Sequence, residues 1–261
     1  SHVTTVSDVQ ADELCRRYPW LPRRRVSAHP IGADPEDFHA LRTQPDPAGD
    51  DVLQPGKLNL SYVGTIWPPA MGPLQTLLEA VARLASVRPD LAGRVQVNFV
   101  GTSNQPNGFG KYAVQPLADA LGIAGLVRET PQRLPYVEAL SVVTRSDALL
   151  MIGSVEPHYS ASKIYANLMT GRPYLSLFHR DSSAHAVLSA AGGGVALAFS
   201  SDAELPGLRD QICAGLERLL DDPQSLGRPD PAAYRDYEAV AIARAYGRIL
   251  DGLVAGSGQR P

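Results

Sequence analysis

From Lys57 onward, short apolar runs alternate with amphipathic segments. The segment after the first run carries six apolar residues at the spacing of one helical face, namely Leu74, Leu77, Leu78, Val81, Leu84 and Ala85. Such a stripe predicts a helix that packs against a core. Residues 147–152 are nearly all apolar, which is typical of a strand covered on both faces. The pattern therefore predicts strands and helices in alternation.

Six strands are predicted, at residues 58–63, 95–100, 126–128, 147–152, 174–178 and 195–199. Helices are predicted at residues 72–87, 112–121, 134–143, 162–170, 183–191, 204–220 and 232–254. Strands separated by helices form a parallel sheet with right-handed crossovers. The predicted fold class is α/β, with a doubly wound, six-stranded, Rossmann-like sheet.

The first 56 residues do not follow this alternation. A strand at residues 3–6 and a helix at 8–18 are followed by a proline-rich stretch. We interpret residues 1–56 as the remnant of another domain with its linker, and residues 57–228 as the Rossmann-like domain. Residues 229–254 form a C-terminal helical segment in this interpretation, and residues 255–261 a disordered tail.

Composition narrows the choice of partners. The 261 residues are 44% apolar and 20% charged, with a formal net charge of −3, so nucleic acid is not an expected partner. No apolar run approaches the roughly 18–20 residues that span a bilayer, so no transmembrane segment is expected. Cys15 and Cys213 match no zinc-ligand spacing, which favours unpaired thiols and a cytoplasmic protein.

Ligands of an open parallel sheet bind beyond the carboxyl ends of its strands. Gly64 and Gly101 follow the first two predicted strands, where glycine lets the backbone approach a ligand closely. A plain tight turn explains one such glycine equally well.

The segment between residues 153 and 173 carries the richest chemistry. Ser160 or Ser162 is placed to cap the predicted helix, which would leave the amides of Lys163 and Ile164 at its N-terminus. Such amides, together with the ammonium of Lys163, suit a diphosphate. A capped, solvated helix start is the alternative interpretation.

Two polar residues, Glu156 and His158, precede that helix. A carboxylate at this place suits the hydroxyl groups of a sugar, and His158 is either a ligand contact or an ordinary polar loop residue.

Four stretches together resemble a known family: Tyr62-Val63-Gly64, Phe99-Val100-Gly101, residues 146–150 and residues 162–173. They resemble the C-terminal, donor-binding domain of the retaining glycosyltransferases with two Rossmann domains (the GT-B type, group 1 or family 4). The opening residues 3–7 and 29–34 are similar to the crossing from the family's N-terminal domain. The final helix is similar to the one that returns to it.

The resemblance implies a role for several residues. Gly64 and Thr65 would lie beside the donor phosphates; Ser162, Lys163 and Ile164 would hold the diphosphate. Glu156 would hold the donor sugar at the catalytic centre, and the backbone around Glu129 and Thr130 would read the base. The donor would be a nucleoside-diphosphate hexose, with no cofactor and no obligatory metal. The other partner would be the protein's own N-terminal domain, without which this part would bind donor but transfer nothing.

The sequence departs from the family at three places. Thr65 and Met71 stand where the family has a basic pair for the diphosphate, and Ala166 stands where it has a glutamate for the ribose. The segment Trp67-Pro68-Pro69 either covers the site or blocks it. A non-catalytic binding or assembly module with an eroded donor site is therefore the main alternative. A sugar-nucleotide epimerase that uses His158 and Glu156 is the other.

Overall fold

The computed structural model describes residues 1–43, 52–106, 109–159 and 161–257. Its centre is a six-stranded sheet in the order β5-β4-β3-β6-β7-β8, with every pair of neighbours parallel. The strands are β3 (Leu58–Val63), β4 (Val95–Val100), β5 (Val127–Thr130), β6 (Ala148–Ile152), β7 (Tyr174–His179) and β8 (Gly194–Phe199). The predicted fold class is confirmed.

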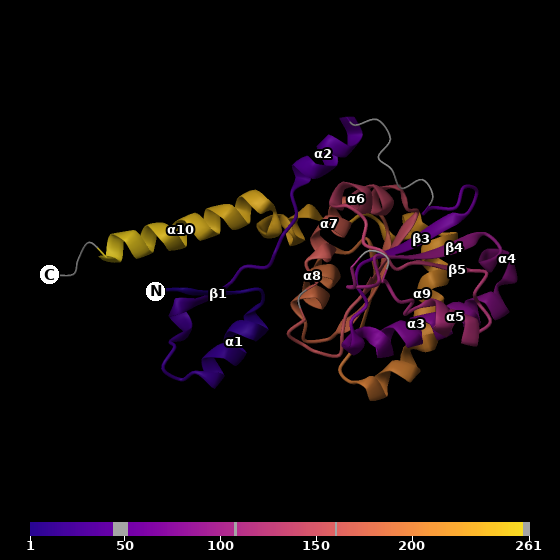
Figure 1. Cartoon of the computed structure of the whole chain (residues 1–261), viewed down its shortest axis with the longest axis horizontal. Coiled ribbons are helices and arrows are strands. Elements are labelled where there is room, and N and C mark those ends of the chain that lie inside the picture. Colours follow the sequence, from indigo (N-terminus) through magenta and orange to yellow (C-terminus); the bar gives the residue numbers. More distant parts are fainter. Residues whose placement is uncertain (44–51, 107–108, 160, 258–261) are drawn as a thin grey trace.

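Helices cover both faces of this sheet (Figure 1). One face carries α3 (Met71–Val87), α4 (Pro89–Ala92), α5 (Gln115–Ala120) and α9 (Arg209–Asp221), and the other carries α6 (Tyr136–Arg145), α7 (Lys163–Met169) and α8 (Ser183–Ala191). Alternate residues of the strands enter the two cores, so that Leu150 and Ile152 pack on the first face and Leu149 and Met151 on the second. Burial on both faces explains why β4, β6 and β7 are buried along their whole length.

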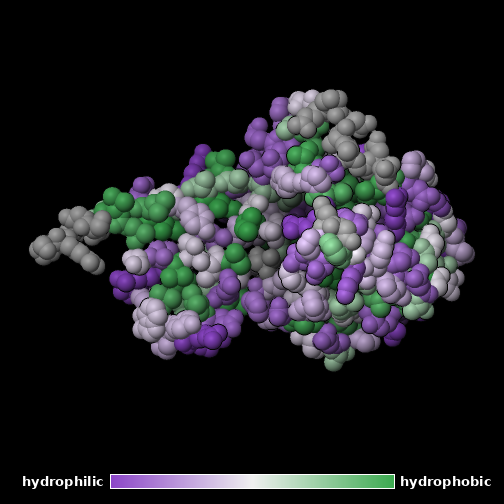
Figure 2. All heavy atoms as spheres, in the orientation of Figure 1, coloured by the Kyte–Doolittle hydropathy of each residue, from purple (hydrophilic) through white to green (hydrophobic). Residues whose placement is uncertain are grey.

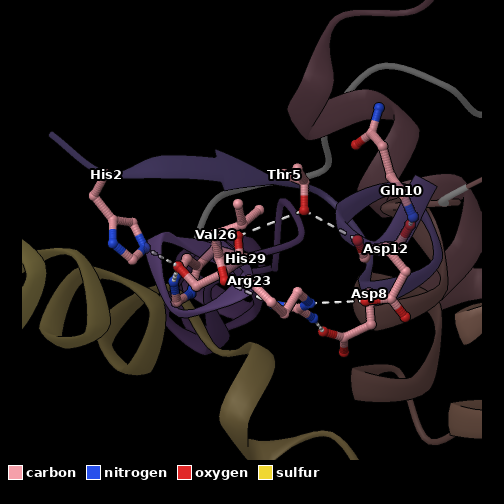
Figure 3. Close-up of polar contacts among 10 residues, drawn as sticks. His2, Thr5, Asp8, Gln10, Asp12, Arg23, Val26 and His29 are labelled. Carbon is pink, nitrogen blue, oxygen red and sulfur yellow. Dashed lines mark hydrogen bonds and ion pairs between the residues drawn. The ribbon is translucent and has the colours of Figure 1, made fainter. Parts of the chain in front are cut away.

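A small second unit lies beside this domain. Its strands β1 (Val3–Thr5) and β2 (Val26–Ala28) pair in parallel, and α1 (Asp8–Arg17) connects them. Arg23 holds the unit together: its guanidinium bonds to Asp8 at 2.9 Å, to Asp12 at 2.7 Å and to the carbonyl of Val26 at 2.6 Å (Figure 3).

The C-terminal helix α10 (Ala239–Ser257) runs from the main domain along the small unit (Figure 1). The rings of His29 and Tyr246 lie 5.1 Å apart at this contact. Apolar side chains of α10 stay exposed, with Val240 at 53% and Leu250 at 60%, and apolar atoms gather along this helix in Figure 2.

The structure corrects the interpretation of the first 56 residues in part. The proline-rich stretch contains β2 and a helix, α2 (Pro35–Thr43), which the sequence analysis missed. Pro35 is the first residue of α2, a position that proline tolerates, and the Asp34 carboxylate accepts the amide of Glu36. The proposed disordered tail was also placed too early, because α10 continues to Ser257. The predicted helix at residues 183–191 matches α8 at both ends, and most other predicted helix ends shift by a few residues. The last two predicted helices begin as 3₁₀ turns.

Candidate functional site

The chain runs outward from β3 to β4 and β5 and then returns to β6 beside β3. Such a reversal leaves a crevice at the carboxyl ends of the two central strands, where sheets of this kind bind ligands. A cavity of about 260 Å³ opens there. Its walls come from the ends of β3 and β6, from the loops after them and from α7: Tyr62, Val63, Thr65, Trp67, Leu150, Met151, Ile152, Tyr159, Ala161, Ser162, Lys163, Ile164, Asn167 and Phe178.

Lys163 carries the positive charge of this wall. It is the first residue of α7, and its ammonium lies against the glycine turn after β3: a Cβ added to Gly64 would be 2.8 Å from Lys163 Nζ. Its side chain keeps contact with solvent but is flanked by protein, and this partial burial, with the charge of Arg133, lowers the pKa of Lys163. A side chain at position 64 would displace this ammonium from its present place, a shift that the flexible lysine side chain allows.

Arg133 brings a second cation to the same edge, from the loop between β5 and α6. Its Cα would lie 3.7 Å from a Cβ on Gly101, the glycine turn after β4. Val63 and Val100 pair in the sheet, so the two turns are neighbours. In the part of the chain that the structure describes, neither Lys163 nor Arg133 has an acidic partner, and no acidic side chain lines the cavity. Unpaired neighbouring cations make a site for an anion.

The predicted helix cap is wrong for Ser162. This residue has helical backbone angles (φ −54°, ψ −27°) and its hydroxyl caps no amide, whereas an N-cap residue needs an extended conformation. The amide of Ile164 is also not free, because it donates to the carbonyl of Ala161 at 3.1 Å. Ser160 lies outside the described residues. Of the groups expected to hold an anion here, the ammonium of Lys163 is thus present at the cavity, whereas the Ser162 cap and the free amide of Ile164 are not.

Thr65 lines the cavity, and it shares with Gly64 a turn that hydrogen bonds fix to the sheet. The amide of Gly64 donates to the carbonyl of Val100 at 2.8 Å, and the hydroxyl of Tyr62 donates to the carbonyl of Thr65 at 3.1 Å. Trp67 stands at the cavity and is 47% exposed, so the segment that begins with it borders the cavity without filling it.

Glu129 has a role that the sequence analysis missed. Its side chain is buried, and its carboxylate accepts hydrogen bonds from the hydroxyl of Thr102 and from the amides of Ala113, Val114 and Gln115. The carboxylate thus fixes the start of α5 and the loop after β4. The carbonyl of Thr130 accepts the amide of Gly101 at 2.8 Å, so it is also engaged within the sheet.

Glu156 and His158 lie together in the loop between β6 and α7. Their side chains approach to 3.9 Å and are 47% and 44% exposed, and neither lines the cavity. The structure therefore brings Thr65, Ser162, Lys163 and Ile164 to one cavity, with Gly64 next to Thr65 in the chain, but leaves this pair beside it.

Two of the three residues that depart from the family, Met71 and Ala166, pack against the hydrophobic cores. Met71 begins α3 and packs against the first core, and Ala166 packs against the second core. A residue that the sequence analysis did not select, Asn167, lines the cavity one helical turn after Lys163. The spacing of four residues from Lys163 is the signal that would have found it.

The described residues contain neither a metal-ligand cluster nor a membrane-spanning helix. In them, no group of three or more His, Cys, Asp or Glu side chains is placed to hold a metal ion, and no helix has the length and apolar character of a membrane span. Cys15 and Cys213 are both free. The expectation that no metal is needed stays a prediction.

Comparison with known proteins gives the chain its relatives. No protein-family profile matches it. A protein of Geodermatophilus obscurus named D-inositol 3-phosphate glycosyltransferase is 35% identical over 153 residues, which are 56% of this chain and 31% of that protein.

Solved structures align with almost the whole chain. HepE of Anabaena, in complex with UDP and glucose, has a TM-score of 0.66 at 14% identity, over 97% of this chain and 63% of HepE. A glycosyltransferase of Rickettsia africae has a TM-score of 0.66 at 12% identity, over 97% of this chain and 64% of its own. An α,α-trehalose-phosphate synthase (UDP-forming) of Burkholderia vietnamiensis has a TM-score of 0.67 at 15% identity, over 99% of this chain and 61% of its own. The predicted resemblance to glycosyltransferases with two Rossmann domains is confirmed at the level of the fold.

Proposed function

We propose that this chain, which shares its fold with solved glycosyltransferases, is the donor-binding part of such an enzyme and holds a nucleoside-diphosphate sugar at the cavity between β3 and β6. The observation that carries the proposal is a pair of cations, Lys163 and Arg133, at the glycine turns after β3 and β4. As the glycosidic bond of a donor breaks, negative charge builds on the departing diphosphate, and cations fixed in advance stabilise that charge.

The size of the cavity fits part of a donor. Its volume of about 260 Å³ is slightly below the roughly 300–1,000 Å³ of most small-molecule sites. We therefore place the diphosphate and sugar at the cavity and the base along the surface toward Gly101 and the loop that carries Arg133. Because HepE was solved with UDP and glucose, UDP is the first nucleotide to test. Retaining transfer of a hexose in the cytoplasm is the reaction that the family resemblance favours.

A further domain of the same protein completes the proposed enzyme. The chain spans 31% of the G. obscurus relative and 63% of HepE, and α10 exposes apolar residues beside the small β1–β2 unit. We propose that the protein's N-terminal domain packs on this surface and supplies the acceptor site. The chain by itself is then expected to bind donor without transferring its sugar.

Isothermal titration calorimetry with UDP, GDP and ADP tests the donor site. We expect one nucleotide to bind, and Lys163→Ala and Arg133→Ala each to weaken it about 10- to 100-fold, since a hydrogen bond to a charged group contributes roughly 1.5–3 kcal/mol. Lys57→Ala is the matched control, because Lys57 lies at the opposite, amino end of β3, where it bonds to the carbonyl of Gly93. Equal affinities in the native protein and Lys163→Ala would refute the proposal.

One observation favours a second function. Ala166 lies in an apolar core and offers no carboxylate for a ribose, as expected of a non-catalytic module whose donor site has eroded. In that case the folded chain would bind none of the three nucleotides.

A further inference from the structure

Asn167 presents an unpartnered carboxamide to the cavity. Its side chain lines the cavity, and the residue is only 8% exposed. The backbone carbonyl of Asn167 accepts the hydroxyl and the amide of Thr170, but no described residue bonds to its carboxamide. Its polar atoms are not among the fully buried side-chain atoms that lack a partner, so the cavity leaves them open to solvent. A carboxamide that faces an open cavity is free to bond to a ligand.

The surroundings of Asn167 define what such a ligand offers. Apolar and aromatic side chains, among them Tyr62, Tyr159 and Phe178, line the same cavity. Lys163 is the only charged residue among the lining residues that the structure describes, and it precedes Asn167 by four residues on α7. Side chains at this spacing lie on the same helix face, roughly 5–6 Å apart at their Cβ atoms. A ligand whose phosphate binds Lys163 can therefore reach Asn167 with the group attached to that phosphate.

We infer that Asn167 binds a hydroxyl group of the donor's sugar ring, and that it is a specificity residue for the glycosyl group rather than for the nucleotide. The inference rests on the proposed donor site. A carboxamide both donates and accepts hydrogen bonds, as a sugar hydroxyl does, and an apolar wall with few polar groups is how small-molecule sites fix orientation. Sites built to hydrogen bond a hydroxyl discriminate strongly against ligands that lack it.

The experiment compares each free nucleotide with its sugar conjugate by calorimetry: UDP with UDP-glucose, GDP with GDP-mannose and ADP with ADP-glucose. The variants are Asn167→Leu, which keeps similar volume without polar groups, and Asn167→Ala. For the pair that binds the native chain, we expect both variants to leave the affinity for the free nucleotide unchanged and to weaken the sugar conjugate at least about tenfold, the effect of one lost hydrogen bond.

One control variant and one stability measurement accompany the titrations. Gln211→Ala removes an exposed carboxamide from α9, away from the cavity, and should change neither affinity. If Asn167 were merely structural, Asn167→Leu would lower the melting temperature, whereas removal of an unpartnered amide should leave it unchanged or raise it. An equal loss for nucleotide and conjugate, or no loss for the conjugate, overturns the role of Asn167 while the donor site stands. If no nucleotide or conjugate binds the native chain, both proposals fail.

Discussion

The carboxylate of Glu129 is the buried charge on which the loop after β4 depends. One oxygen accepts the hydroxyl of Thr102 and the amide of Ala113 at 2.9 Å. The other accepts the amides of Val114 and Gln115, both at 2.8 Å. Glu129→Gln keeps the shape of this side chain but replaces one acceptor with an NH₂ donor.

The geometry decides which way the new amide turns. Toward Val114 and Gln115 the NH₂ group would face two N–H donors. Toward Thr102 and Ala113 it faces one hydroxyl, which rotates to accept, and one N–H that is left without a partner. The second orientation loses one charge-assisted bond of roughly 1.5–3 kcal/mol and weakens the others, so we expect Glu129→Gln to destabilise the protein by about 2–4 kcal/mol.

Urea unfolding, followed by circular dichroism, measures this change. Thr102→Val is the matched variant: it removes a single bond of the same carboxylate and should cost about 1–2 kcal/mol. The two changes share one partner, so they should not be additive in the double variant. A loss below about 0.5 kcal/mol for Glu129→Gln, within the range of ordinary surface substitutions, would show that the carboxylate does not hold the loop.

Two further predictions concern the strand ends. Because desolvation and Arg133 lower the pKa of Lys163, its ammonium loses its proton at a lower pH than an ordinary lysine, and calorimetry should show nucleotide affinity falling in alkaline solution at a lower pH than an ordinary lysine would give. Lys163→Arg stays charged and should flatten that fall; an identical pH profile in both proteins would contradict the role of Lys163. Gly153→Ala would place a Cβ 2.5 Å from a ring atom of the buried Phe178 and should cost roughly 1–3 kcal/mol, seen as a lower melting temperature. Gly125→Ala, where a Cβ meets nothing within 4 Å, is its control, and equal melting temperatures would refute the packing argument.

The sheet was predictable because its strands are buried on both faces. Three of the six strands, β4, β6 and β7, are buried at every residue, and such runs stand out against the amphipathic helices between them. The prediction failed in the proline-rich stretch. Its prolines suggested a linker, but Pro35 is the first residue of the helix α2.

The site was predictable only as far as its backbone frame. Gly64, Gly101 and Lys163 follow from the rule that ligands lie at the carboxyl ends of strands. The conformation of Ser162, which is helical and so caps nothing, is set by tertiary packing that the local sequence does not reveal. Arg133 and the structural role of the Glu129 carboxylate were not predicted for the same reason, because their partners are distant in sequence and become neighbours only in the folded chain.

The charge of Arg133 affects the pKa of Lys163, and this effect makes it possible to test whether Arg133 also binds the diphosphate directly. In the free protein Arg133 disfavours the charged form of Lys163, so Arg133→Ala should raise the pKa of Lys163 and keep its charge to higher pH. If Arg133 acted only in this way, its removal would strengthen nucleotide binding in alkaline solution. If it also contacts the diphosphate, removal weakens binding at every pH, although the remaining affinity persists further into the alkaline range. A diphosphate that lies between the two glycine turns requires the second pattern. The bound anion attracts both cations, and this attraction outweighs the repulsion between them.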